Sequence, residues 1–146
     1  GLEEGVIDCI VSDPSPSTID LKDVENGDFG VAWGGVASLQ LGLPLIWSEA
    51  KQRGLKLEQV VQWMGVNPSK LAGLGAKGSI EEGKDADFAI FAPEDTFAVD
   101  VEKLHHKNPI SPYQGKTLHG VVRRAIIAGN DVDFQTPSGQ LIRREH

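Results

Sequence analysis

The feature that most constrains the fold lies near the start of the chain. Residues 6–12 (VIDCIVS) form a short run of apolar and β-branched side chains with little polar alternation. Such a run predicts a strand buried on both faces of a parallel sheet. A parallel strand needs neighbouring strands reached by long crossovers, and this chain holds only one such run. We therefore expect a piece of a longer protein whose partner strands lie upstream, in keeping with a first residue, Gly1, that is not methionine.

The predicted strand stops abruptly at Asp13, which is followed by Pro-Ser-Pro. Neither a helix nor a strand continues through that sequence, so a sharp loop is expected. A loop after the carboxyl end of a buried parallel strand is where barrel enzymes place their chemistry. Two interpretations of Asp13 follow. It either begins the loop as an Asx-turn or N-cap residue, or serves as a metal ligand or general base.

The middle of the chain is predicted to be helical. After a loop over residues 14–30 and a glycine-paired turn at 33–38 (WGGVAS), apolar residues recur at helical spacing. Helices are expected at 44–54, 55–64 and 67–73, the last with Asn67 as N-cap and Gly73 just past its end. The apolar stripes are interpreted as core faces.

The last third is predicted to be rich in β-structure. A turn at 82–84 joins a short strand to another at 86–91, with Phe88 buried beside Ile90. Residues 93–118 are expected to be mostly irregular. Two strands within 121–134 are joined at 128–131, and the tail from Leu141 forms an edge strand or is disordered.

Composition excludes several classes of function. The net charge of −7 and the lack of a Lys/Arg run argue against nucleic acid or an anionic membrane as partner. No apolar stretch approaches the length of a membrane-spanning helix. The single cysteine, Cys9, excludes an internal disulfide and a multi-thiolate metal site, and is expected to be packing.

Five consecutive stretches together resemble a known family. They are IDCIVSDPSPSTIDLK, AWGGVASLQLGLPLIWSEAKQRG, NPSKLAGL, KGSIEEGKDADFAIFAP and LHHKNPISPYQGKTLHGVVRRAIIAGNDV. Over residues 5–132 the chain resembles the C-terminal third of the allantoinases, cyclic amidohydrolases related to dihydropyrimidinases and dihydroorotases. The GxIxxGxDADxxIF pattern is shared widely among amidohydrolases, whereas WGGVASLQLGLPL and HHKNPISPYQGKTLHG point to the allantoinases.

The resemblance implies an α/β fold, the C-terminal part of a metal-dependent (β/α)₈ TIM barrel with part of a small β-sandwich. Residues 1–74 would supply the last barrel strand and the C-terminal helices, and residues 75–146 a sandwich segment and the tail. The resemblance further implies a homo-oligomer, in particular a tetramer. The compartment stays open between the cytoplasm and an organelle.

The resemblance also assigns roles. It implies zinc-dependent hydrolysis of a cyclic ureide, allantoin, to allantoate in purine catabolism, with one or two zinc ions in the full-length protein. Asp13 would touch the metal and act as general base. The Gly34-Gly35 turn would present backbone N–H and C=O groups to the substrate, although the glycines also suit positive φ alone. Ser17 would lie in the substrate-binding loop.

Two departures and one absence qualify this assignment. The family usually has Asp-His-Ser-Pro-Cys where this chain has Asp13-Pro14-Ser15-Pro16-Ser17. The family's remaining metal ligands, a His-x-His pair, a carboxylated lysine and two further histidines, have no counterpart here, so the isolated chain is expected to be inactive. The four histidines of this chain are expected to be surface or packing residues: His105, His106, His119 and His146.

Three functions follow from the resemblance. The first is allantoin hydrolysis. The second is a sister activity on hydantoin or dihydropyrimidine rings, and the third is a non-catalytic scaffold with the same fold. Asp13 and the glycine turn favour the enzymes, whereas Pro14 favours the scaffold.

Overall fold

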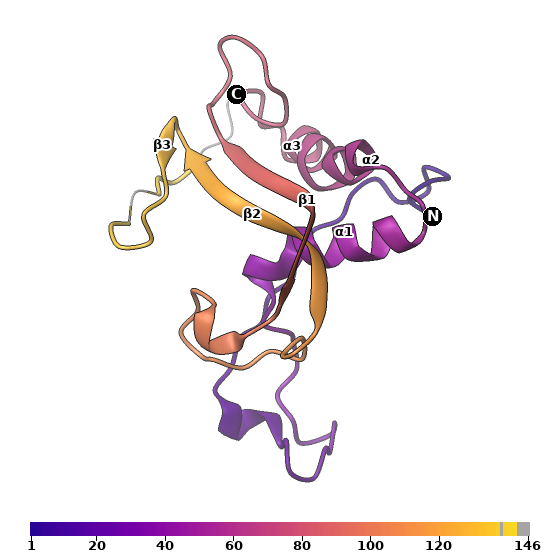
Figure 1. Ribbon diagram of the computed structural model, residues 1–146, viewed down its shortest axis with the longest axis vertical. Coiled ribbons are helices and arrows are strands. Elements are labelled where there is room, and N and C mark those ends of the chain that lie inside the picture. Colours follow the sequence, from indigo (N-terminus) through magenta and orange to yellow (C-terminus); the bar gives the residue numbers. More distant parts are fainter. Residues whose placement is uncertain (138, 143–146) are drawn as a thin grey trace.

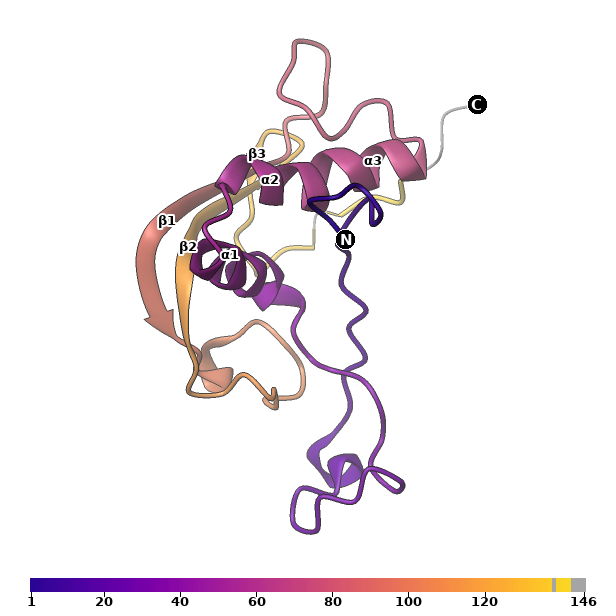
Figure 2. The ribbon, with the colours of Figure 1, turned by 90° about the vertical axis from the view of Figure 1, so that its right-hand side faces the viewer.

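Short helices lie against one face of a long, curved pair of antiparallel strands (Figures 1 and 2). The computed structural model describes residues 1–137 and 139–142. The helical elements are η1 (Ile19–Lys22), η2 (Leu39–Leu41), α1 (Gly42–Gln52), α2 (Leu57–Val61), the π-helical turn η3 (Gln62–Val66), α3 (Asn67–Ala72) and η4 (Val101–Lys103). The strands are β1 (Phe88–Ala98), β2 (Thr117–Ile127) and β3 (Asn130–Asp131), and they pair in that order.

The N-terminal segment is not the buried strand that its sequence predicts. Residues 6–12 have no strand partner within the described part of the chain, and three of their apolar side chains, Val6, Ile7 and Val11, are exposed. Val6 is 76% exposed and Val11 71%. The prediction is wrong for this chain because a strand exists only as part of a ladder of hydrogen bonds to neighbouring strands. From Asp8 the segment runs instead as irregular extended backbone (Figure 2), and its Ile10 N–H donates to the Trp63 carbonyl at 2.9 Å.

The first predicted helix is confirmed as α1. Pro44 lies in its first turn, where its missing N–H costs nothing, and Gly54 follows its end with φ +74°. Trp47 and Ala50 on its inner face pack against the fully buried Val60 of α2. This cluster is one of two small cores. The other joins Leu41, Val99 and Leu118 at the opposite end of the sheet.

The second and third predicted helices form one continuous helical stretch rather than two. Asn67 is not an N-cap but has helical dihedrals, and its N–H donates to the Gln62 carbonyl across a π turn. That wider turn accommodates Pro68, which has no N–H to continue an α-helical ladder. The predicted end of the helix is confirmed, since Gly73 adopts the left-handed conformation with φ +70°.

The β1–β2 pair is longer than its sequence predicts. The strand expected at 86–91 forms, but it continues through Pro93 to Ala98, and β2 already begins at Thr117. Both ends of the stretch 93–118, which was expected to be mostly irregular, therefore belong to strands. Ala92 pairs with Val121 and Thr96 with His119, so Pro93 lies in a bulge where the ladder requires no N–H from it.

The turns at the ends of this sheet are confirmed, but the short flanking strands are not. Residues 82–84 form a turn without a strand before it, and β3 ends at Asp131. Phe88 is only half-buried in this chain. Ala128 and Gly129 have φ values of +49° and +79°, the signature of a two-residue type I′ hairpin.

Asp87 holds the β2–β3 hairpin from the start of β1. Its Oδ1 accepts the Ala128 N–H at 2.8 Å, and its Oδ2 is paired with Lys77. The Lys77 ammonium, followed by the Ala128 N–H, lowers the pKa of the Asp87 carboxyl. The DADF part of the sequence therefore ties the loop before β1 to the hairpin after β2.

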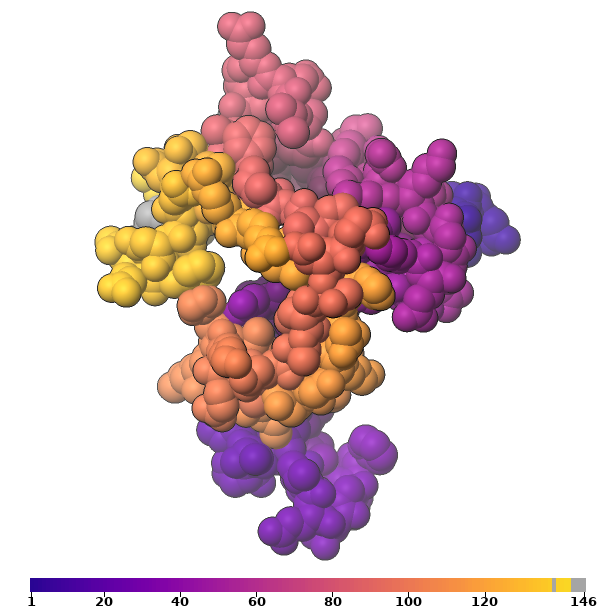
Figure 3. Space-filling model, in the orientation of Figure 1, coloured from indigo at the N-terminus to yellow at the C-terminus, as the bar shows by residue number. Residues whose placement is uncertain are grey.

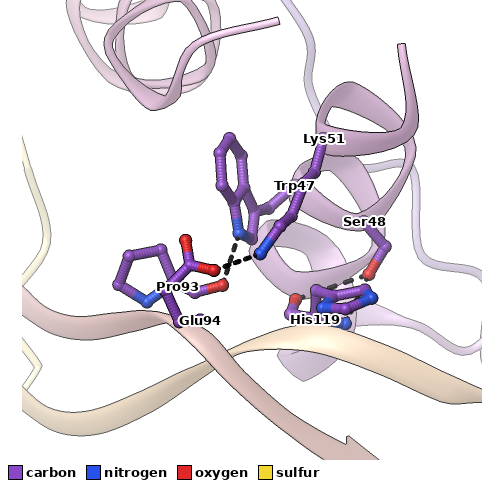
Figure 4. Close-up of polar contacts among 6 residues, drawn as sticks. All are labelled: Trp47, Ser48, Lys51, Pro93, Glu94 and His119. Carbon is purple, nitrogen blue, oxygen red and sulfur yellow. Dashed lines mark hydrogen bonds and ion pairs between the residues drawn. The ribbon is translucent and has the colours of Figure 1, made fainter. Parts of the chain in front are cut away.

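Helix α1 is fixed to the sheet by polar contacts as well as by packing (Figure 4). Trp47 Nε1 donates to the Pro93 carbonyl at 2.9 Å, and Lys51 Nζ lies 2.6 Å from Glu94 Oε2. Ser48 Oγ accepts the His119 N–H at 2.7 Å and donates to the Pro44 carbonyl. The bulge in the sheet is thus held against the helix from both strands.

Two further predictions concern the ends of the molecule and membranes. Leu141 and Ile142 belong to no strand, and the rest of the predicted tail, residues 143–146, lies outside the described residues. Among the residues that the structure describes, no helix is long and apolar enough to cross a membrane.

Candidate functional site

The sequence motifs that point to chemistry lie on residues 13–36, a long arm that projects from the helices and the sheet (Figures 1 and 2). In the space-filling view the tip of this arm is the indigo to purple lobe at one end of the molecule (Figure 3). Two strips of the arm run side by side. Pro14 forms a parallel bridge with Val36, and the Ser15 N–H lies 3.3 Å from the Val36 carbonyl. The structure therefore brings the Asp13 loop and the Gly34-Gly35 turn together.

The two glycines of the turn are there for different reasons. Gly35 has φ +90°, and a Cβ at this position would lie 2.0 Å from Ser15 Cβ. Its lack of a side chain is therefore required by the backbone and by the neighbouring strip. Gly34 has no positive φ, and a Cβ there would meet no atom within 4 Å. A positive φ therefore explains the glycine at position 35, but it does not explain the glycine at position 34.

Lys22 closes the arm from the other side. This residue ends η1, and its Nζ donates to the carbonyl oxygens of Trp33, Gly34 and Gly35 at 2.9, 3.3 and 2.8 Å. The carbonyl groups of the turn are thus already bound by an ammonium, although each oxygen keeps a second lone pair. The N–H groups of Gly34 and Gly35 have no partner among the described residues.

Local hydrogen bonds fold the acidic loop that brings Lys22 to the turn. Asp23, in the left-handed conformation, accepts from Asn26 Nδ2 at 2.8 Å and from the Asp28 N–H at 3.2 Å. The chain then reverses, and the Trp33 N–H donates to the Leu21 carbonyl at 2.7 Å. Short Asx turns of this kind are what an Asp- and Asn-rich loop is expected to form.

Asp13 lies at the base of the arm with its side chain exposed. Within the described residues its carboxylate accepts no hydrogen bond, so neither an Asx turn nor an N-cap is formed. The following residue is proline, which has no N–H to offer, and the Ser15 N–H is directed to Val36. The carboxylate is therefore free to meet an outside group.

Ser17 differs from Asp13 in that it is buried, with 7% of its surface exposed. Its hydroxyl has no hydrogen-bond partner among the described residues. It makes no hydrogen bond to the glycine turn, so the structure places it in the same loop as Asp13 without joining it to Gly34 or Gly35.

Three of the four histidines lie in the part of the chain that the structure describes. His105 stacks on Phe134 with ring centroids 3.9 Å apart, and His106 Nε2 lies 3.0 Å from the Val101 carbonyl. His119 lies in β2 with a buried Nδ1 that has no partner in the described part of the chain, and His146 lies outside that part. Among the described residues no group of three or more His, Cys, Asp or Glu side chains could hold a metal ion.

Sequence reasoning missed Lys22. The available signal was the charge pattern, because Lys22 is the single cation between residues 20 and 28, a stretch that also holds three aspartates and one glutamate. A cation in an acidic loop invites the interpretation of a surface ion pair. The structure pairs it instead with three consecutive backbone carbonyls.

Comparison with known proteins identifies the family of this chain. The sequence model of the amidohydrolase family matches residues 1–132. The chain belongs to the amidohydrolase family. Within that family it is 51% identical over 148 residues to the allantoinase of Streptomyces avermitilis, covering 99% of this chain and 33% of the relative. It is 47% identical over 131 residues to the allantoinase of Arabidopsis thaliana, covering 88% of this chain and 26% of the relative.

Solved amidohydrolase structures show the same fold. The D-hydantoinase (dihydropyrimidinase) of a Thermus species matches with a TM-score of 0.84 and 25% identity, over 99% of this chain and 33% of that protein. The L-hydantoinase (dihydropyrimidinase) of Arthrobacter aurescens matches with a TM-score of 0.82 and 27% identity, over 98% and 32%. This amidohydrolase chain thus spans between about a quarter and a third of the length of these relatives.

Proposed function

We propose that the full-length protein containing this chain hydrolyses the cyclic amide of allantoin to give allantoate, in purine catabolism. One observation carries the proposal. The free carboxylate of Asp13 and the open face of the Gly34-Gly35 turn are joined by the Pro14–Val36 bridge, in a segment that is 51% identical to an allantoinase. In that protein, residues 1–74 would complete a (β/α)₈ barrel and the following residues part of a β-sandwich, within a homotetramer.

Asp13 carries the proton in the proposed reaction. Its carboxylate accepts a proton from a water molecule as the water oxygen forms a bond to the ring carbonyl carbon. The ring C–N bond then breaks, and Asp13 returns the proton to the departing nitrogen. A positioned acid–base group of this kind contributes about 10²- to 10⁴-fold in rate. A carboxylate held free of internal hydrogen bonds is suited to the task, because it begins the reaction without a competing donor.

The glycine turn orients the ring. A cyclic ureide carries carbonyl acceptors beside N–H donors, and the N–H groups of the two exposed residues Gly34 and Gly35 have no partner among the described residues. Ser17, in the same loop as Asp13, has a hydroxyl without a partner and is proposed to serve the same binding site. Backbone donors suit a ring substrate because their direction is fixed by the fold.

The residues of this chain do not by themselves fit a zinc ion. Asp13 would supply one oxygen ligand, but among the described residues it belongs to no group of three or more His, Cys, Asp or Glu side chains that could hold a metal ion. We propose that the remaining ligands come from the barrel portion outside this chain, for one or two ions. When bound, zinc supplies Lewis-acid polarisation of the ring carbonyl.

A second candidate is hydrolysis of hydantoin or dihydropyrimidine rings. The favouring observation is the structural match to two hydantoinases with TM-scores of 0.84 and 0.82. The replacement of the usual histidine by Pro14 favours the third candidate, a non-catalytic scaffold.

An assay of the full-length protein separates the three candidates. The protein is incubated with allantoin, hydantoin and dihydrouracil, each with and without a chelator, and ring opening is followed. Faster turnover of allantoin, abolished by the chelator and restored by zinc, is the expected result. A preference for hydantoin or dihydrouracil supports the second candidate, and no ring opening with any substrate supports the scaffold.

A further inference from the structure

Lys22 makes an unusual choice of partners. Its ammonium donates to three consecutive carbonyls, those of residues 33–35, although acidic residues lie beside it in the sequence. Lys22 forms no ion pair with any described residue. Asp23 instead accepts from Asn26 and from the Asp28 N–H. The three hydrogens of the ammonium are therefore matched by three backbone acceptors.

This contact fixes the direction of the backbone donors on the opposite side of the turn. Every peptide bond of the described chain is trans, so each N–H points away from the carbonyl of its own peptide plane. The peptide that holds the Trp33 carbonyl also holds the Gly34 N–H, and the next peptide holds the Gly35 N–H. Because both carbonyls turn toward Lys22, both N–H groups turn away from it.

Without the ammonium this arrangement would not persist. Three carbonyl dipoles that converge on one point repel one another unless a cation lies between them. Glycine peptides also rotate more freely than others because no Cβ restricts φ and ψ. The Gly34-Gly35 turn would then populate other arrangements, in which its N–H groups no longer face the open surface.

We propose that Lys22 is a positioning residue for the substrate site, holding the N–H groups of Gly34 and Gly35 toward the ring carbonyl of a cyclic ureide. The inference rests on the proposed hydrolysis of such rings. Lys22 does not touch the substrate in this assignment. It acts through the turn, and its loss lowers the fraction of protein whose turn is ready to bind.

The test compares three variants of the full-length protein in steady-state kinetics with allantoin. Lys22→Met removes the ammonium but keeps the length and much of the volume of the side chain. If the turn is then competent about a tenth of the time, KM rises about tenfold with kcat little changed. Lys22→Arg keeps the charge, but a planar fork cannot place one donor centre among three carbonyls, so its KM is expected between those of the parent and the Met variant.

Lys84→Met is the matched control. Lys84 Nζ also caps a loop carbonyl, that of Gly75, at 2.5 Å, and its loop lies at the other end of the molecule from the arm (Figures 1 and 2). Its KM is expected to stay that of the parent. Thermal melts of all variants report on folding, and if Lys22→Met does not fold, the KM of Lys22→Arg decides.

The outcomes are distinct. A raised KM confined to the Lys22 variants supports the inference. An active parent enzyme whose Lys22 variants keep the parental KM overturns it while leaving the proposed function intact. A parent protein that opens none of the cyclic ureides overturns both.

Discussion

Asp13 is the residue on which the proposed chemistry depends, and its carboxylate accepts no hydrogen bond within the described chain. In the full-length protein we expect Asp13→Asn to lower kcat for allantoin at least about 100-fold, or roughly 2.7 kcal/mol of barrier. The amide keeps the size of the side chain but cannot accept the water's proton. Steady-state assays measure the loss, and a thermal melt shows that the fold is kept.

Asp20→Asn is the matched control, since Asp20 is an exposed aspartate of the same arm without a described hydrogen-bond partner. It is expected to leave kcat unchanged. Near-normal turnover by Asp13→Asn in an active parent would show that Asp13 only shapes the loop.

The two glycines of the turn give a second prediction at this scale. Gly35→Ala combines a φ of +90° with a Cβ 2.0 Å from Ser15 Cβ, so the two strips of the arm must separate. The strain of a left-handed alanine alone costs about 1–2 kcal/mol. We expect Gly35→Ala to lower activity at least tenfold, as about 1.4 kcal/mol corresponds to a factor of ten, and to make the arm more sensitive to limited proteolysis.

Gly34→Ala separates packing from binding, because a Cβ at Gly34 meets no described atom within 4 Å. The variant is expected to keep the parental proteolysis pattern and to raise KM, since the methyl group enters the surface that the ring approaches. An unchanged KM would assign this turn a structural role only.

The candidate site was only partly predictable at the residue scale. Asp13, Gly34 and Gly35 were found because each breaks a local pattern, a strand end or a glycine pair. Lys22 was not, because its partners are backbone carbonyls 11 to 13 residues away and backbone acceptors leave no trace in a sequence. Only the folded loop brings the ammonium to the turn.

At the scale of elements, Ser48 is the polar link between α1 and β2 (Figure 4). Ser48 is buried, and its Oγ accepts the N–H of the half-buried His119 at 2.7 Å. Ser48→Ala leaves that N–H without a partner, so we expect a loss of about 1–3 kcal/mol in the free energy of unfolding. Chemical denaturation of the full-length protein measures the loss.

Ser79→Ala serves as the comparison, because the Ser79 hydroxyl has no hydrogen-bond partner among the described residues. Its free energy of unfolding is expected to stay within about 0.5 kcal/mol of the parent. Equal losses for the two variants would mean that the contact between Ser48 and His119 contributes nothing specific to stability.

Elements whose signals are local were predicted well, and those set by tertiary contacts were not. Pro44 and Gly54 delimit α1, and Gly73 ends the second helical stretch, as expected from helix capping. Residues from 93 onward were expected to be mostly irregular, yet β1 continues through Pro93 to Ala98. The bulge that accommodates it depends on Trp47 and on the pairing with β2, which no local pattern reveals.

At the scale of the whole molecule, the chain exposes far more surface than a compact domain of its length. The structure exposes 10659 Å². A compact monomer of this size exposes about 7,300 Å². The excess lies in the N-terminal segment before Asp13, the arm over residues 13–36 and the open face of the sheet (Figures 1 and 3). Two small cores thus support a chain whose sequence predicts burial against neighbours that the described residues do not contain.

The isolated chain is therefore expected to aggregate rather than to fold as a monomer. Val6, Ile7 and Val11 are more than half exposed, with exposed fractions of 76%, 53% and 71%. They lie in a β-prone run that has no strand partner among the described residues, and such a run is the usual template for intermolecular pairing. Size-exclusion chromatography over a range of concentrations should show association, and thermal unfolding should be broad.

A variant of the isolated chain with Val6→Lys and Val11→Lys should stay monomeric to higher concentration, because charges in the run oppose pairing. A sharp two-state melt of the monomeric parent chain would contradict this prediction, since it would show that the two small cores suffice without the missing neighbours of residues 6–12.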